Sequence, residues 1–173
     1  KDLQIKVGDC SIAAANLPPT TINCESFTTN FFNSGDQSLI HSYFWTFGDP
    51  STGINDTSTL ANPTHVFSDT GVFKVTLVTN RNEACTDTGV TIVKIYPGFF
   101  AGFNSSGICV TKPTLFTDAT TTQYGVVDSW HWDFGVPTLT NDTSRLQNPS
   151  FSYSAIGTYT AQLIVTCSKG CID

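Results

Sequence analysis

The sequence contains few charged residues, and basic residues are the scarcest. Its 173 residues include eight Lys and Arg against fourteen Asp and Glu, which gives a net charge of −6. Eight scattered cationic side chains cannot form a basic patch, so the composition argues against nucleic acid and anionic membranes as partners. No apolar run approaches the ~18 residues of a membrane-spanning helix, so we expect no membrane span.

The sequence also has none of the short motifs that mark common catalytic sites. It contains no G-x-S-x-G, H-E-x-x-H or P-loop pattern. No close pair of carboxylates in an apolar setting indicates glycosidase chemistry. The three histidines, His41, His65 and His131, stand far apart and no C-x-x-C is present, so a metal centre is not indicated. We therefore expect a protein that is not an enzyme.

The chain does not begin with methionine and shows no secretory signal peptide, yet it contains six cysteines. We interpret it as a mature fragment from an oxidising, extracellular or cell-surface environment. Thr, Ser, Asn and Phe are abundant, which is typical of β-rich structure with polar but uncharged outer faces.

One aromatic stretch occurs twice. Tyr43–Asp49 reads YFWTFGD, and Trp130–Val136 reads WHWDFGV. The match continues over Asn55–Ser58 with Asn141–Ser144, Asn62-Pro63 with Asn148-Pro149, Gly71–Phe73 with Gly157–Tyr159, and Cys85 with Cys171. A period of about 86 residues is too long for a solenoid unit and fits one small domain repeated in tandem.

These residues resemble the PKD (polycystic kidney disease) family of β-sandwich domains. The family signature combines W-x-F-G-D, N-P-x-H-x-Y/F and G-x-Y-x-V-x-L, and its three parts begin here at Trp45, Asn62 and Gly71. The resemblance implies an all-β chain of tandem immunoglobulin-like (PKD-type) sandwiches. The copies look like the repeats of large secreted surface proteins of the Bacteroidetes group. A fold alone does not specify a function.

We expect three segments: residues 1–9, 10–97 and 98–173. Leu3–Val7 alternates apolar and polar residues as Thr91–Tyr96 does, so residues 1–9 are interpreted as the last strand of a preceding PKD-like domain. We expect the second domain to lack its own last strand within this window. Either the sequence is a window from a longer array, or a strand from one copy completes the sheet of another.

Within the first domain, alternation and turn residues predict a series of strands and no helix. The expected strands are Ala13–Leu17, Glu25–Asn33, Tyr43–Phe47, Val66-Phe67, Val72–Thr79 and Thr91–Tyr96.

The cysteines are assigned from the repeat. Because Cys24 and Cys85 occupy the same places as Cys109 and Cys171, the repeat predicts the disulfides Cys24–Cys85 and Cys109–Cys171. The partners of the remaining two cysteines are unknown, and Cys167–Cys171 across a tight turn is an alternative. These two are Cys10 and Cys167.

Aromatic residues are the candidates for ligand contact. Trp45 and Trp132 lie within strands beside aromatic residues on the same face, so we expect core packing rather than sugar binding. Phe99, Phe100 and Trp130 are the candidate surface-binding aromatics, with core or junction packing as the alternative.

A calcium site is the only cofactor for which the sequence offers candidates. Asp49 and Asp56 lie in loops rich in oxygen ligands, which suit a hard cation. The second copy has Val136 in place of Asp49, and no EF-hand spacing exists. His65 is expected to form a structural hydrogen bond, and His131 to lie on the surface.

The leading functional hypothesis is a non-enzymatic structural repeat of a large secreted cell-surface protein: a spacer, fibre or adhesin stalk that could assemble into a filament or ring. Its partners would be neighbouring PKD-like domains or further copies of the chain. The alternative is an accessory carbohydrate- or protein-binding module of a secreted hydrolase, which would contact a surface glycan or protein.

Overall fold

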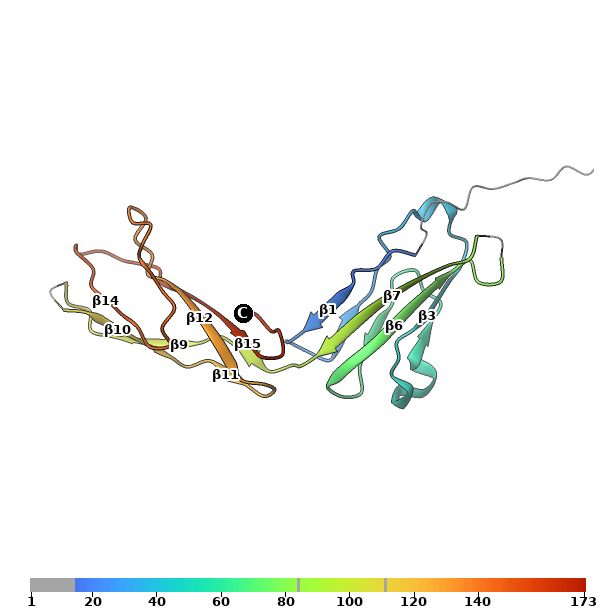
Figure 1. The fold of residues 1–173 in the computed structure, drawn as a ribbon, viewed down its shortest axis with the longest axis horizontal. Coiled ribbons are helices and arrows are strands. Elements are labelled where there is room, and N and C mark those ends of the chain that lie inside the picture. Colours follow the sequence, from blue (N-terminus) through green and yellow to red (C-terminus); the bar gives the residue numbers. More distant parts are fainter. Residues whose placement is uncertain (1–14, 84, 111) are drawn as a thin grey trace, which may run out of the picture. The chain divides into compact units, whose positions relative to one another are not determined.

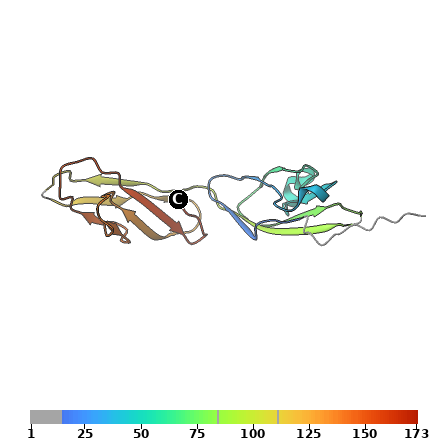
Figure 2. The ribbon, with the colours of Figure 1, turned by 90° about the horizontal axis from the view of Figure 1, so that it is seen from above.

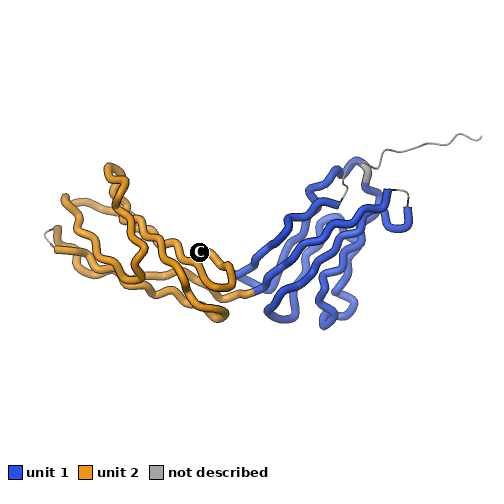
Figure 3. The backbone as a smooth tube through the Cα atoms, in the orientation of Figure 1, with its two compact units in different colours: residues 1–95 blue, residues 96–173 orange. Residues whose placement is uncertain are grey.

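The computed structural model describes residues 15–83, 85–110 and 112–173. The chain divides into two compact units, residues 1–95 and 96–173 (Figure 3). The regular secondary structure of each unit consists almost entirely of strands (Figure 1). The expected strand in residues 1–9 lies outside the described residues.

Unit 1 contains a five-stranded sheet in the order β1-β7-β6-β3-β4 and a second, two-stranded sheet of β2 and β5. The strands are β1 (Thr20–Asn23), β2 (Thr28–Asn30), β3 (Tyr43–Thr46), β4 (Thr57–Ser58), β5 (Thr64–Val66), β6 (Gly71–Thr79) and β7 (Asp87–Ile95). Two short 3-10 helices, η1 (Gln37–Leu39) and η2 (Pro50–Asp56), lie in its loops. In Figure 2 the β6–β7 hairpin forms one layer of unit 1, with the helix-bearing loops above it.

The hairpin of β6 and β7 is the longest pairing of unit 1. It runs from Thr79 opposite Asp87 to Gly71 opposite Ile95. Alternate residues of both strands face inward, so Val75, Leu77, Val93 and Ile95 are fully buried. They form one core with five further buried side chains, which are Ala15, Phe31, Trp45, Phe47 and Phe67.

Strand β1 pairs in parallel with β7, with Thr20 opposite Ile92 and Asn23 opposite Ile95. The expected first strand, Ala13–Leu17, is therefore wrong for its described part, since residues 15–17 belong to no strand. Pro18-Pro19 precedes the observed strand instead of ending it, because a proline without an N–H is tolerated just before a strand at the edge of a sheet.

Unit 2 repeats the arrangement with more fragmented sheets, ordered β14-β10-β9, β11-β8 and β13-β12-β15. The strands are β8 (Phe99–Phe100), β9 (Phe103–Ser106), β10 (Thr114–Asp118), β11 (Thr121–Thr122), β12 (Val127–Asp133), β13 (Thr143–Ser144), β14 (Ser150–Phe151) and β15 (Gln162–Cys167). Trp132, Phe134, Phe116 and Val165 are buried in its centre.

Candidate functional site

A buried carboxylate follows the aromatic strand of unit 1. Asp49 is 2% exposed. Its Oδ1 accepts a hydrogen bond from Ser68 Oγ at 2.6 Å, and its Oδ2 accepts one from the Ser68 backbone N–H at 2.7 Å. His65 Nε2 lies 3.3 Å from Oδ2, and its ring stacks on Phe47 with centroids 4.2 Å apart. The expected structural hydrogen bond of His65 is thus confirmed.

These contacts keep Asp49 ionised. Burial by itself would raise the pKa of this carboxyl, but hydrogen bonds from Ser68 and the hydrogen bond and charge of His65 bring the pKa below its ordinary value. Asp56 accepts a hydrogen bond from the Asp49 backbone N–H at 2.6 Å. Both calcium candidates therefore face N–H and O–H donors, an arrangement that favours loop closure over cation binding.

Among the described residues, no group of three or more His, Cys, Asp and Glu side chains is arranged to hold a metal ion.

Unit 2 closes the equivalent loop with apolar contacts. The Val136 backbone N–H donates to Asp142 Oδ2 at 2.7 Å, which reproduces the bond between Asp49 and Asp56. Phe151 takes the place of His65 and stacks on Phe134 with centroids 4.6 Å apart. The loop is therefore built on the same backbone plan, while the polar pair of unit 1 is replaced by Val136 and Phe151.

The two repeated tryptophans are core residues, as predicted. Trp45 and Trp132 are both fully buried. Their indole N–H groups donate to the backbone oxygens of Leu60 at 3.0 Å and Leu146 at 2.9 Å. Neither ring face is available to a sugar.

The candidate surface aromatics divide into three cases. Phe99 is 3% exposed, so its assignment as a surface-binding residue is wrong. The next residue of strand β8, Phe100, points the other way and is 54% exposed, as the alternation of a strand requires. Trp130 is half-buried, and its indole N–H donates to Asp118 Oδ2 at 2.8 Å.

Asp118 is the second carboxylate held by several donors. Besides Trp130, it accepts hydrogen bonds from the Thr120 backbone and from the Gln147 amide. Burial alone would raise its pKa, but the hydrogen bonds from Thr120, Trp130 and Gln147 lower it below the ordinary value. Trp130 thus helps to hold the Asp118 carboxylate in unit 2.

The expected disulfide pairs are both wrong. Cys24 and Cys85 are disulfide-bonded, but Cys24 follows Asn23, which pairs with Ile95 at the end of β7, whereas Cys85 precedes the start of that strand. The length of β7 separates them by about 26 Å at 3.3 Å per residue, beyond the ~7 Å between Cα atoms that a disulfide tolerates.

In unit 2, Cys171 is disulfide-bonded, while Cys109 and Cys167 are free thiols, the former exposed and the latter buried. Neither Cys109–Cys171 nor the alternative Cys167–Cys171 is therefore formed. Equivalence in the repeat places two cysteines at corresponding points of a sandwich, but it does not place them next to each other. Cys10 lies outside the described residues.

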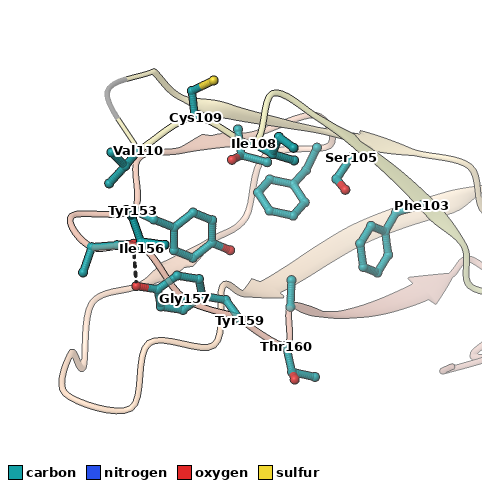
Figure 4. Close-up of a pocket in the computed structure, with 14 residues that line it drawn as sticks. Phe103, Ser105, Ile108, Cys109, Val110, Tyr153, Ile156, Gly157, Tyr159 and Thr160 are labelled. Carbon is teal, nitrogen blue, oxygen red and sulfur yellow. Dashed lines mark hydrogen bonds between the residues drawn. The ribbon is translucent and has the colours of Figure 1, made fainter.

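Unit 2 also contains a large apolar groove that the sequence motifs did not reveal. Its volume is about 840 Å³. Figure 4 shows Phe103 on one side and Tyr153 and Tyr159 on the other, with Ile156 and Cys109 at one end. Ile108 and Ile156, which both line it, are 97% and 94% exposed.

The topology and the aromatic cores define two immunoglobulin-like β-sandwiches in tandem. The family model described as PKD domain matches residues 12–95 and again residues 101–173. The chain belongs to the PKD domain family. Domains of this kind are typically non-catalytic and serve as structural or binding modules.

Among solved structures, the chain is similar to the one titled "Crystal structure of Dscam1 isoform 9.44, N-terminal four Ig domains". The identity is 11% and the TM-score is 0.32, over 88% of this chain and 40% of that chain. The chain thus spans less than half of that protein's length.

None of the helices in the described ranges is long and apolar enough to cross a lipid bilayer. The family and the disulfide-bonded cysteines suggest an extracellular domain.

Proposed function

We propose that this chain is a non-enzymatic structural repeat of a large secreted cell-surface protein, in which it serves as a spacer, a fibre element or part of an adhesin stalk. The observation that supports this most strongly is the nature of the residues shared by the two copies. They are core and turn residues: Trp45 and Trp132, Phe47 and Phe134, Gly48 and Gly135, Asp56 and Asp142, Pro63 and Pro149.

The residues with the most reactive chemistry are not shared. The buried His65–Asp49 pair of unit 1 corresponds to Phe151 and Val136 in unit 2. A module selected for catalysis or for a bound ion would need its polar group in each copy that performs the task. A scaffold needs only that each copy folds, and both copies retain the residues for folding.

The test is to stretch the whole chain between two handles, under reducing conditions so that disulfides do not hide length. Two separate unfolding events are expected, one per unit. The 78 residues of unit 2 should release at most roughly 270 Å of chain at about 3.5 Å per residue. A single gradual extension without such events would contradict a role as a stiff repeat.

The alternative is an accessory module of a secreted hydrolase that holds a carbohydrate or protein surface. Phe100, which is 54% exposed, is the observation in its favour. All three tryptophans, however, are engaged in the interior or in a hydrogen bond to Asp118. Co-sedimentation of the chain with insoluble polysaccharides, with Phe100→Ala as the variant, tests this alternative. Retention that Phe100→Ala abolishes would favour it.

A further inference from the structure

The turn that follows β15 brings two cysteines opposite each other. Thr166 and Ile172 form an antiparallel bridge. At the next position along the hairpin, the Cys167 N–H donates to the Cys171 carbonyl at 3.0 Å. The Gly170 N–H closes the turn by donating to the Cys167 carbonyl at 2.8 Å. The two cysteines are therefore the last opposed pair of this hairpin before its turn.

Both cysteine side chains point into unit 2. Cys167 is 3% exposed and Cys171 is 1% exposed, whereas the neighbouring Ile172 faces outward. Opposed residues that share a backbone hydrogen bond in an antiparallel pair have Cα atoms about 5.5 Å apart. This separation lies within the range of about 4.4–6.8 Å that a disulfide spans. The Lys169 N–H also donates to Cys167 Sγ at 3.4 Å, which holds this sulfur beside the turn.

The two sulfurs are nevertheless in different chemical states. Cys167 is a free thiol, whereas Cys171 is disulfide-bonded. The partner of Cys171 is neither Cys109 nor Cys167, because both of these are free, so the partner lies outside the hairpin. A reduced thiol thus stands opposite one half of an existing disulfide, which is the arrangement from which thiol–disulfide exchange starts.

Unit 1 contains the bonded cysteine without the neighbouring thiol. Cys85 corresponds to Cys171 in the repeat and is also disulfide-bonded. Arg81 takes the position of Cys167, and its guanidinium carbon lies 4.2 Å from the centre of the Phe44 ring. The fold of these domains therefore does not require a thiol at this position, and the pair of sulfurs at the turn is particular to unit 2.

We propose that this hairpin is an internal thiol–disulfide exchange site. The Cys167 thiolate attacks Cys171 Sγ, the Cys167–Cys171 bond forms, and the existing disulfide bond of Cys171 breaks. The former partner leaves as a thiolate and takes up the proton that Cys167 gave up. One thiol and one disulfide remain, so the step consumes neither an oxidant nor a reductant.

The exchange changes which part of the chain is cross-linked. Before it, the disulfide of Cys171 joins the hairpin to a cysteine outside it and limits how far the intervening chain can extend. Afterwards, the cross-link encloses only residues 167–171 and restrains nothing beyond the turn. Because both sulfurs are buried, local opening of the hairpin gives Cys167 the freedom to turn toward the bond that it attacks.

This chemistry gives the proposed structural role a regulated length. A repeat under tension opens its hairpin, exchanges the disulfide and extends further, while the number of disulfides in the chain stays the same. The purpose of the site rests on the proposed structural role, whereas its chemistry does not.

The first test follows the disulfides of the whole chain by mass spectrometry. The chain is purified without reductant, incubated in mild denaturant at about pH 8, near the ordinary pKa of a thiol, and trapped with N-ethylmaleimide. Trypsin then cuts after Lys169, between the two cysteines. Exchange appears as the fragment that ends at Lys169 cross-linked to the fragment that begins at Gly170. The cysteine that becomes newly labelled is the former partner of Cys171.

We expect these cross-linked fragments to accumulate at a rate that does not depend on protein concentration. Cys167→Ser should slow the loss of the original disulfide of Cys171 at least about 100-fold, because a thiol held beside its target acts at an effective concentration of roughly millimolar or more. Cys109→Ser is the matched control, since it removes the other free thiol among the described residues and should leave the rate unchanged.

Circular dichroism establishes that the variants fold, and Cys167→Ala replaces Cys167→Ser if a buried hydroxyl disturbs the interior. Absence of the cross-linked fragments, even in denaturant that opens the hairpin, would overturn the proposal. So would their presence in every purified chain before incubation, because no thiol would then be left to exchange.

Stretching the chain without reductant tests the purpose of the site separately. At constant force, the unmodified chain should show a further extension step after its two unfolding events, and Cys167→Ser should lack that step. Exchange in solution without two unfolding events would retain the exchange site and contradict the structural role. Two unfolding events without exchange would retain the structural role and overturn the exchange site.

Discussion

The loop after the aromatic strand is held differently in the two units. In unit 1, His65 lies between the Phe47 ring and the Asp49 carboxylate, and Ser68 supplies two further donors. In unit 2, Phe151 lies on Phe134, and Val136 stands at the position of Asp49. The same loop backbone thus accommodates either a polar pair, Asp49 and His65, or an apolar pair, Val136 and Phe151. Both residues of the pair differ between the units.

The largest loss of stability is expected from substitution of the tryptophans, which both units share. Trp45→Ala and Trp132→Ala should each destabilise their own unit by about 3–5 kcal/mol, since each removes a large, fully buried ring. Trp45 should be nearer the upper value, because its core is closed, whereas Phe103 beside Trp132 is 37% exposed.

Hydrogen exchange of the backbone amides of β6 and β15 follows the two units separately within the whole chain. Loss of protection in both units from either single substitution would show that the units do not unfold independently.

The second-largest loss of stability is expected from substitution of the glycine that follows each aromatic strand. Gly48 and Gly135 have positive φ angles of 70° and 73°, and an added Cβ would collide with the backbone oxygen of Lys74 or Thr160. Alanine at either site should cost at least about 2 kcal/mol, from the left-handed backbone and from the collision.

We expect the larger loss for Gly48→Ala. Lys74 is paired with Ile92 within the long ladder of β6 and β7, whereas Thr160 precedes β15 and can shift. Urea unfolding monitored by the exchange protection of each unit measures the difference. Equal losses would show that Thr160 is held as firmly as Lys74.

Unit 1 should still fold when its polar pair, Asp49 and His65, is replaced. Asp49→Asn removes the charge that Ser68 and His65 stabilise and should cost about 2 kcal/mol. Replacing both polar residues as in unit 2, with Asp49→Val and His65→Phe, should recover part of this loss. If the double variant is less stable than Asp49→Asn, the two fillings are not interchangeable.

The double variant should also change how the stability of unit 1 depends on pH. The pKa of Asp49 in the folded state is lowered, so the stability that it contributes is present above its unfolded pKa and is lost as the pH falls through the folded value. The double variant should therefore remove part of the acid sensitivity of unit 1. The sensitivity that Asp118 gives to unit 2 should be unchanged. Thermal unfolding between about pH 2 and pH 6 checks this, because the ordinary pKa of Asp lies within that range.

The smallest effect is expected at Phe100. Its side chain is 54% exposed, so Phe100→Ala should change the stability of unit 2 by no more than about 0.5 kcal/mol. Thermal unfolding of the whole chain measures it. A loss above 1.5 kcal/mol would place this ring in packing that its exposure does not indicate.

The sequence predicted the features that depend on local pattern. The alternation at Trp45 and Phe47 identified their buried face, and the resemblance to the family supplied the sandwich. It could not predict which sheet edge a short polar strand would join, so β1 was missed. The disulfide pairs were wrong for a related reason: a repeat shows that two positions correspond, whereas a bond requires that they lie within a few ångströms of each other. The groove is lined by residues from segments far apart in the sequence, which no local pattern brings together.

The parallel pairing of β1 and β7 also determines how unit 1 resists tension applied along the chain. Tension enters before Thr20 and leaves after Ile95, so it drives the two strands past each other lengthwise. Their interstrand hydrogen bonds then lie across the direction of pull and must yield together in shear, whereas a pair pulled from one end opens one bond at a time. A segment of only four residues, from Thr20 to Asn23, can thereby set the force at which the whole unit gives way.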